Sequence, residues 1–154
     1  MRIISIKIPQ KHRLFLFLFL ATSWVTGITF YILNRWFMVE GMFGPEKHPW
    51  QFTILQIHGI AAFGMLMAYG AILANHVPQS WKANRLRGIG VLLLTAFSSQ
   101  VITAYLLYYL ANENGRTITS NIHTIIGLIL PLILGIHIWL GIKTKRQNHR
   151  TMPR

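Results

Sequence analysis

Long apolar runs separated by short polar segments dominate the chain. We expect four helices of about 20 residues each, the length that crosses the hydrocarbon core of a bilayer; they span Leu14–Leu33, Phe52–Ala74, Ile89–Leu110 and Ile122–Ile142. Backbone groups in lipid must be satisfied within the protein, which a helix achieves alone. The pattern therefore predicts an all-α integral membrane protein, with residues 1–154 forming one transmembrane domain, an up-down four-helix bundle.

Composition agrees with a membrane-embedded chain. Of the 154 residues 53% are hydrophobic and 12% are charged, and the mean hydropathy is +0.43. The chain has no cysteine, which excludes a disulfide, a thiolate metal site and a c-type haem attachment. The first apolar run is too long for a cleaved signal peptide, so we interpret it as a retained helix.

The charges predict the orientation. Twelve of the fifteen basic residues lie in the N-terminal arm, the second connection and the tail, with no acidic residue among them. All three acidic residues, Glu40, Glu46 and Glu113, lie in the first and third connections. The positive-inside rule then places both termini in the cytoplasm, and a bacterial inner membrane is the expected location. We interpret the net charge of +12 as an orientation signal beside anionic lipid, not as a nucleic-acid site.

The three connections are expected to be irregular. The first, Asn34–Gln51, is the longest and contains two tryptophans suited to the membrane interface. The second, Asn75–Gly88, is a predicted cytoplasmic turn, and the third, Ala111–Asn121, carries Asn114-Gly115 as its turn signal. Pro131 is a predicted kink in the last helix.

Four histidines within the apolar helices are the candidate functional residues. Two lie on the second helix and two on the fourth: His58, His76, His123 and His137. Imidazole is costly in lipid, and such residues usually mark a functional site. On an ideal helix, His76 lies on almost the same face as His58. His137 lies within roughly 40° of His123 around the helix axis.

Matched pairs of histidines on two helices suggest bis-histidine haem ligation, because haem iron takes one axial nitrogen from each side. We expect His58 with His123 to hold an outer b-type haem, and His76 with His137 to hold an inner one. The axial separations differ, about 27 Å between His58 and His76 and about 21 Å between His123 and His137. His76 lies at the membrane edge, so if only one haem binds we expect it to be the outer one. The alternative is that the histidines form hydrogen bonds between helices.

Haem propionates need cationic or polar partners. The outer candidates are Arg116, Lys47 and Arg35. Arg116 is the leading one, and its alternative partner is Glu113. The inner candidates are Lys82, Arg85, Arg87 and Lys143, for which membrane topology alone is the preferred explanation.

The residues around these histidines resemble a known family. They are Leu55-Gln56-Ile57-His58-Gly59, Asn75-His76-Val77, Ile122-His123-Thr124, Gly135-Ile136-His137 and the stretch Thr103–Leu110. The pattern is similar to the small four-helix, bis-histidine b-type cytochromes of bacterial inner membranes, the cytochrome b561-like proteins. The resemblance implies that histidines on facing helices hold haems near both membrane surfaces. The step from His58 to His76 is longer than is usual in that family.

We therefore predict a diheme cytochrome that moves electrons across the membrane. The donor would be a quinol or a cytoplasmic protein, and the acceptor a periplasmic redox partner or a larger complex. One alternative is a quinone-coupled oxidoreductase acting on a small oxidant such as superoxide. Another is a haem-free anchor or assembly subunit. His48, in the first connection, is either a quinol or docking residue or a solvated side chain, and the polar residues of the third helix either join helices or contact a quinone.

Overall fold

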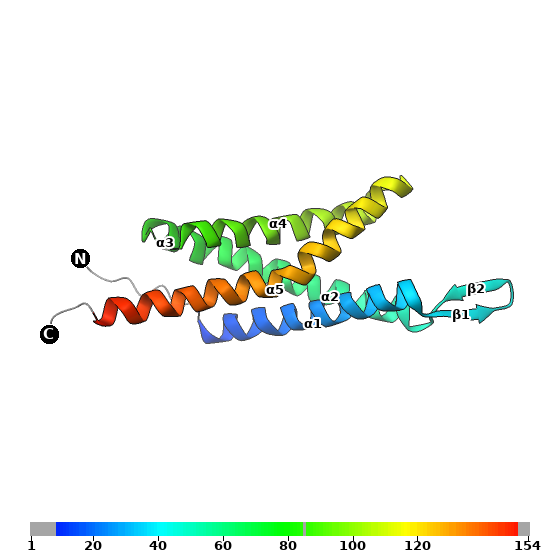
Figure 1. The fold of residues 1–154 in the computed structure, drawn as a ribbon, viewed down its shortest axis with the longest axis horizontal. Helices are drawn as coiled ribbons and strands as arrows, with labels where there is room; N and C mark the ends of the chain where they lie inside the picture. The colour runs from blue at the N-terminus through cyan, green and yellow to red at the C-terminus, as the bar shows by residue number, and fades with distance from the viewer. Residues whose placement is uncertain (1–8, 85, 151–154) are drawn as a thin grey trace. The chain divides into compact units, whose positions relative to one another are not determined.

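The computed structural model describes residues 9–84 and 86–150, with side chains up to residue 144. The elements run in the order α1 (Gln10–Trp36), β1 (Met38–Gly41), β2 (Gly44–Lys47), α2 (Trp50–Ala71), the π-helix η1 (Ile72–His76), α3 (Val77–Lys82), α4 (Arg87–Tyr109) and α5 (Glu113–Arg150) (Figure 1). They form two compact units that meet in sequence between His76 and Val77. We call them the N-terminal unit and the C-terminal unit.

The predicted all-α membrane fold is confirmed. Four helical segments are long and apolar enough to cross a bilayer: Gln10–Trp36, Trp50–Lys82, Arg87–Tyr109 and Glu113–Thr144. Large apolar side chains on them are exposed, as lipid contact requires; Ile60 is 69% exposed and Phe63 is 64% exposed. These properties are those of a multi-pass membrane protein.

In the N-terminal unit, α1 and α2 run antiparallel and pack along their length (Figure 1). Small residues of α2 suit close helix packing, and Ala61 and Ala68 are buried. At Gly64 a Cβ atom would overlap the ring of Phe19 on α1. The glycine is therefore required by the packing of the two helices.

The first connection is an antiparallel β-hairpin, where the sequence predicted an irregular loop. Met38 pairs with Lys47 and Gly41 pairs with Gly44, which leaves Met42 and Phe43 at the tip. Gly44 has φ +117°, a backbone conformation open to glycine and strained for other residues. The two strands, 38–41 and 44–47, lack the apolar–polar alternation by which a strand is recognised, so the pattern concealed them.

The second connection is shorter than predicted, because the helix continues past Asn75. The π-helix η1 leads directly into α3, which ends at Lys82. Pro78 has no N–H to donate to the carbonyl four residues earlier, and a π turn just before it changes the hydrogen-bond register there. The turn itself is confined to the few residues before α4, where Asn84 and Leu86 have positive φ.

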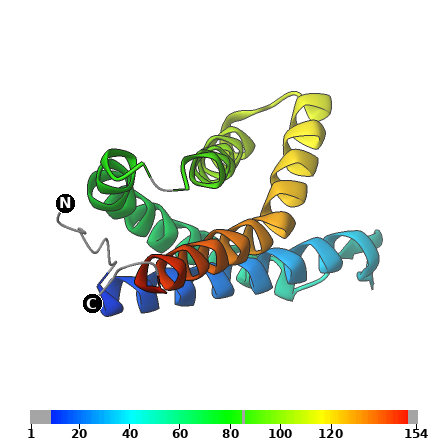
Figure 2. The same cartoon turned by 60° about the vertical axis from the view of Figure 1, so that its left-hand side comes forward.

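In the C-terminal unit, α4 and α5 run antiparallel (Figures 1 and 2). The side-chain amide of Gln100 on α4 donates a hydrogen bond of 2.8 Å to the carbonyl of His123 on α5. Gly127, one turn later, lies against the same amide group. Helix α5 contains Pro131 and changes direction between its yellow and orange parts in Figure 2, in agreement with the predicted kink.

The third connection is also shorter than predicted, because α5 already begins at Glu113. Asn112 caps the helix: its side-chain oxygen accepts a 2.8 Å hydrogen bond from the N–H of Gly115. Asn114-Gly115 is therefore part of the first helical turn and not a reverse turn. Glu113 adds a negative charge at the helix N-terminus, which is favourable there.

Candidate functional site

His58 projects from α2 towards α1 within the N-terminal unit. Its Nδ1 lies 2.9 Å from the carbonyl oxygen of Ser23 and 3.3 Å from Oγ1 of Thr26. A carbonyl oxygen only accepts hydrogen bonds, so Nδ1 carries the proton. In a neutral imidazole the lone pair is then on Nε2. His58 is thus held in the form that ligates a metal through Nε2.

The backbone of α1 approaches this ring closely. A Cβ atom at Gly27 would lie 3.0 Å from Cε1 of His58 and 3.3 Å from its Nδ1. Glycine therefore leaves space on α1 for the imidazole ring, beside the two oxygens that face Nδ1.

His123 makes a corresponding contact within the C-terminal unit. Its Nδ1 lies 2.8 Å from Oγ1 of Thr103 on α4. Its main-chain carbonyl accepts the hydrogen bond from Gln100 described above. The side chain and the backbone of His123 are therefore both attached to α4, which fixes the ring relative to that helix.

The other two predicted ligands differ in their surroundings. His137 is partly buried, and its Cε1 lies 4.0 Å from where a Cβ atom on Gly90 would be. Its Nδ1 is buried and has no hydrogen-bond partner among the residues that the structure describes. His76 is partly buried and ends the π-helix η1.

The prediction that His58 and His76 lie on the same face of one helix is wrong. The prediction assumed a continuous α-helix, whereas Ile72–His76 forms a π-helix. A π turn closes five residues apart instead of four, so it holds about one more residue than an α turn. This rotates His76 by roughly a quarter of a turn from the bearing that 18 α-helical residues would give.

The charged candidates lie at helix ends and on the β-hairpin. Arg116 is exposed in the first turn of α5, and Arg35 and Lys47 are exposed on the N-terminal unit. Arg87 donates a 2.8 Å hydrogen bond to the carbonyl of Trp81, and its guanidinium lies 4.7 Å from the centre of that indole ring.

The remaining inner candidates for a propionate partner are Lys143, Lys82 and Arg85. Nζ of Lys143 lies 5.1 Å from the centre of the Trp139 ring. Lys82 is exposed, and Arg85 lies outside the described residues. Cations paired with tryptophan suit a membrane interface, which agrees with topology as the reason for Arg87 and Lys143.

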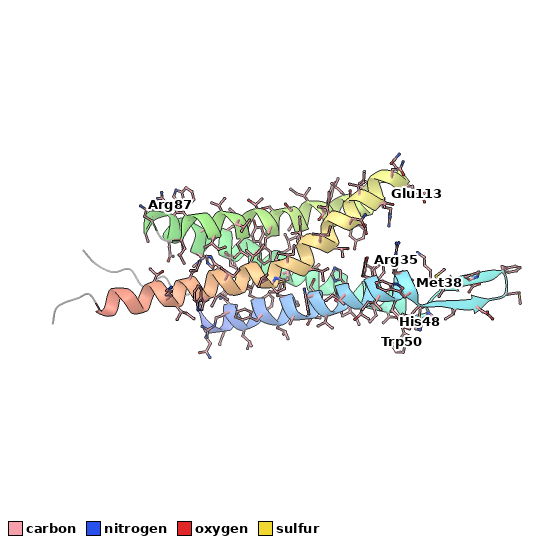
Figure 3. The ribbon with its side chains drawn as sticks, in the orientation of Figure 1. Arg35, Met38, His48, Trp50, Arg87 and Glu113 are labelled. Atoms are coloured by element: carbon pink, nitrogen blue, oxygen red, sulfur yellow. The ribbon has the colours of Figure 1, made fainter. Side chains whose placement is uncertain are left out.

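His48 is held locally at the base of the β-hairpin. Its Nδ1 accepts a 3.2 Å hydrogen bond from the backbone N–H of Trp50. Figure 3 shows His48 and Trp50 close to Arg35 and Met38, at the end of the N-terminal unit that carries the hairpin. The contact gives His48 a structural role in the approach to α2.

The donor set fits haem iron. Among the described residues no three His, Asp or Glu side chains gather to hold one metal ion. Haem is bound in a different way, because the porphyrin supplies four nitrogens and the protein adds only axial ligands. Imidazole nitrogens presented through Nε2 and oriented by a second hydrogen bond are typical axial ligands.

Sequence reasoning missed Ser23 and Thr26 and gave Thr103 no specific partner. These residues accept the histidine contacts in the two units. Serine and threonine are common in membrane helices, so their presence alone carried no signal.

No family model matches the chain, and no curated protein or solved structure is similar enough to it to count as a match.

Proposed function

We propose that this chain is a b-type membrane cytochrome in which histidines serve as the axial ligands of haem. His58 and His123, one from each unit, are the leading pair. His76 and His137 are the second pair, for a second haem. The proposed role is electron transfer across the membrane between a quinol or cytoplasmic donor and a periplasmic partner.

One observation carries this proposal: His58 and His123 are oriented in the same way, each by a contact to the neighbouring helix of its own unit. In each unit Nδ1 of the histidine faces an oxygen of the preceding long helix, at 2.9 Å for His58 and 2.8 Å for His123. The same ring nitrogen faces an oxygen of the neighbouring helix in both, which is the kind of second contact that usually orients a metal-ligating histidine. An imidazole that serves only to join helices has no need for the same nitrogen in each unit.

Bound haem would supply one-electron chemistry through its iron. The protein's part is to hold the two imidazoles neutral, to fix their orientation, and to surround them with apolar side chains that exclude water. Two axial histidines leave no open position, so the chain is suited to transferring electrons and not to activating oxygen.

The second haem rests on different support. Nδ1 of His137 is buried without a hydrogen-bond partner in the described part of the chain. His137 therefore lacks the hydrogen bond at Nδ1 that orients His58 and His123, and it enters the proposal through its place in the sequence. His76 likewise enters the proposal through its place in the sequence.

Location and orientation are part of the proposal. The distribution of basic residues supports cytoplasmic termini, and the tryptophan contacts of Arg87 and Lys143 suit a membrane interface. A bacterial inner membrane is the expected site. The β-hairpin and the start of α5 would then face the periplasm, with Arg116 available to a propionate.

The first experiment is haem per chain on protein purified from its membrane, with a reduced-minus-oxidised absorbance spectrum. Two b-type haems support both pairs, and one haem supports a single site. The key variant is His123→Ala, expected to remove the outer haem and keep the inner one. His48→Ala is the matched control, because His48 contacts its own loop, and it should keep the wild-type haem content. A His123→Ala variant that loses neither haem contradicts the pairing.

The contacts of His58 and His123 also favour a second function. Hydrogen bonds between helices stabilise a membrane protein without any cofactor, by about 1 kcal/mol each. On that reading the chain is a haem-free anchor or assembly subunit of a larger complex. Folded protein that stays colourless when supplied with haem supports this function and contradicts the cytochrome.

A further inference from the structure

Two threonines occupy equivalent places in the two units. Thr26 is on α1 and Thr103 is on α4, the helix that precedes the histidine-bearing helix in each unit. Both are buried, at 8% exposure each. Oγ1 of Thr26 lies 3.3 Å from Nδ1 of His58, and Oγ1 of Thr103 lies 2.8 Å from Nδ1 of His123.

Each threonine uses its own proton on its own helix. Thr26 donates its hydroxyl hydrogen to the carbonyl of Thr22 at 2.6 Å, with the carbonyl of Ser23 at 3.2 Å. Thr103 does the same towards the carbonyl of Ser99 at 2.6 Å, with that of Gln100 at 3.2 Å. A hydroxyl has one hydrogen, and these carbonyls can only accept it. The threonine oxygen is therefore left as an acceptor towards the histidine.

We infer that Thr26 and Thr103 are positioning residues that hold His58 and His123 as the Nδ1–H tautomer, the form in which a neutral imidazole ligates a metal through Nε2. The inference rests on the proposed haem function as far as the metal is concerned, whereas the tautomer is a property of the protein itself. A hydroxyl whose hydrogen is used on its own helix favours the Nδ1–H tautomer, because the opposite tautomer would place a lone pair against its oxygen. Neither threonine touches the iron in this proposal.

The two threonines contribute unequally. At His58 the shorter contact is the backbone carbonyl of Ser23, at 2.9 Å, and Thr26 is the longer one. At His123 the threonine itself makes the 2.8 Å contact. A backbone carbonyl survives a side-chain substitution, so the loss of Thr103 should affect His123 more than the loss of Thr26 affects His58.

The test compares Thr103→Val, which keeps the shape and removes the hydroxyl, with Thr103→Ser, which keeps the hydroxyl. The matched control is Thr29→Val, because Thr29 also donates to its own helix, at 2.8 Å to the carbonyl of Val25, but is only partly buried and makes no histidine contact in the described part of the chain. Each full-length protein is measured by nitrogen NMR of uniformly labelled histidine rings, by haem titration and by redox titration. Reduced bis-histidine haem is diamagnetic, so the ring nitrogens remain observable.

For Thr103→Val we expect the His123 ring to lose its uniform Nδ1–H form. Haem affinity should fall about 10- to 100-fold, the usual effect of losing such a partner. The midpoint potential should rise, because an imidazole without an acceptor at Nδ1 donates less charge and stabilises ferric iron less. Thr103→Ser should restore all three properties, and Thr26→Val should produce a smaller change.

Different results would separate the two proposals. If the protein binds no haem, the cytochrome proposal fails, and the ring nitrogens still report on the threonines. A Thr103→Val protein that folds and has the same tautomer as Thr29→Val overturns the positioning role. The same holds if Thr103→Ser, with its hydroxyl intact, behaves like Thr103→Val.

Discussion

Gly27 on α1 and His58 on α2 lie in direct apposition: a Cβ atom at residue 27 would lie 3.0 Å from Cε1 of the imidazole. That distance is tighter than ordinary van der Waals contact, so any side chain at residue 27 must displace the ring or separate the helices. The glycine thus sets where the imidazole of His58 can lie. The relationship connects helix packing with the geometry of the candidate ligand.

Gly27→Ala should therefore disturb the His58 site specifically. We expect lower haem occupancy or a shifted absorbance band, measured on the purified variant. Gly90→Ala is the matched control, because its Cβ would lie 4.0 Å from Cε1 of His137, an ordinary contact. A Gly27→Ala protein with the spectrum of the wild type would show that the ring is not constrained there.

Gly64→Ala should destabilise the packing of α1 against α2. Its Cβ would overlap the Phe19 ring, and overpacking of this kind costs about 1–3 kcal/mol. The measurement is the thermal or denaturant midpoint in one detergent. Gly70→Ala, on the same helix with nothing within 4 Å, should be neutral or stabilising by up to about 1 kcal/mol. Adding Phe19→Leu should recover part of the loss, and absence of any recovery would argue against the contact.

Asn112→Ala should weaken the start of α5. It removes the side-chain oxygen that accepts from the N–H of Gly115, and loss of such a cap costs about 1 kcal/mol. Amide hydrogen exchange should accelerate in the first turn of α5 and stay unchanged at His123 and beyond. Asn112→Asp keeps an acceptor at that position and should behave as the wild type does. Equal exchange in the alanine and aspartate variants would rule out the cap.

The orientation can be tested with single introduced cysteines, because the chain has no native cysteine to remove first. Met42→Cys places a thiol at the hairpin tip, where Met42 is 88% exposed. A membrane-impermeant maleimide should label this thiol from the periplasmic side of intact cells. Lys143→Cys, on the side proposed to be cytoplasmic, should react only after the membrane is opened. The reverse pattern would invert the proposed topology.

Much of the architecture follows from local sequence. The four apolar runs determined the spans to within a few residues at most ends, because transfer of a helix into lipid depends on its own side chains. The kink at Pro131 was also a local prediction, since proline lacks the N–H that a helix needs.

Three local features were not predicted from the sequence: the early start of α5, the β-hairpin and the π-helix before Pro78. Asn112 caps α5 and draws Asn114-Gly115 into the helix, although that pair usually marks a turn. The strands 38–41 and 44–47 form through pairing with each other, and neither has an alternating pattern of its own. The π-helix before Pro78 changed the bearing of His76, which an ideal helical wheel cannot include.

The sequence by itself determined that imidazoles lie within membrane helices, because three histidines inside apolar runs and a fourth just beyond one of them can be read directly from it. Only the tertiary structure decided which oxygen each leading histidine meets. Thr26 and Thr103 look like any other threonines of the helices, and Thr29 is one turn from Thr26 with the same bond to its own helix. Their contacts with His58 and His123 depend on how far one helix is shifted along its neighbour. That register is fixed by packing between residues 20 or more positions apart, which no local pattern encodes.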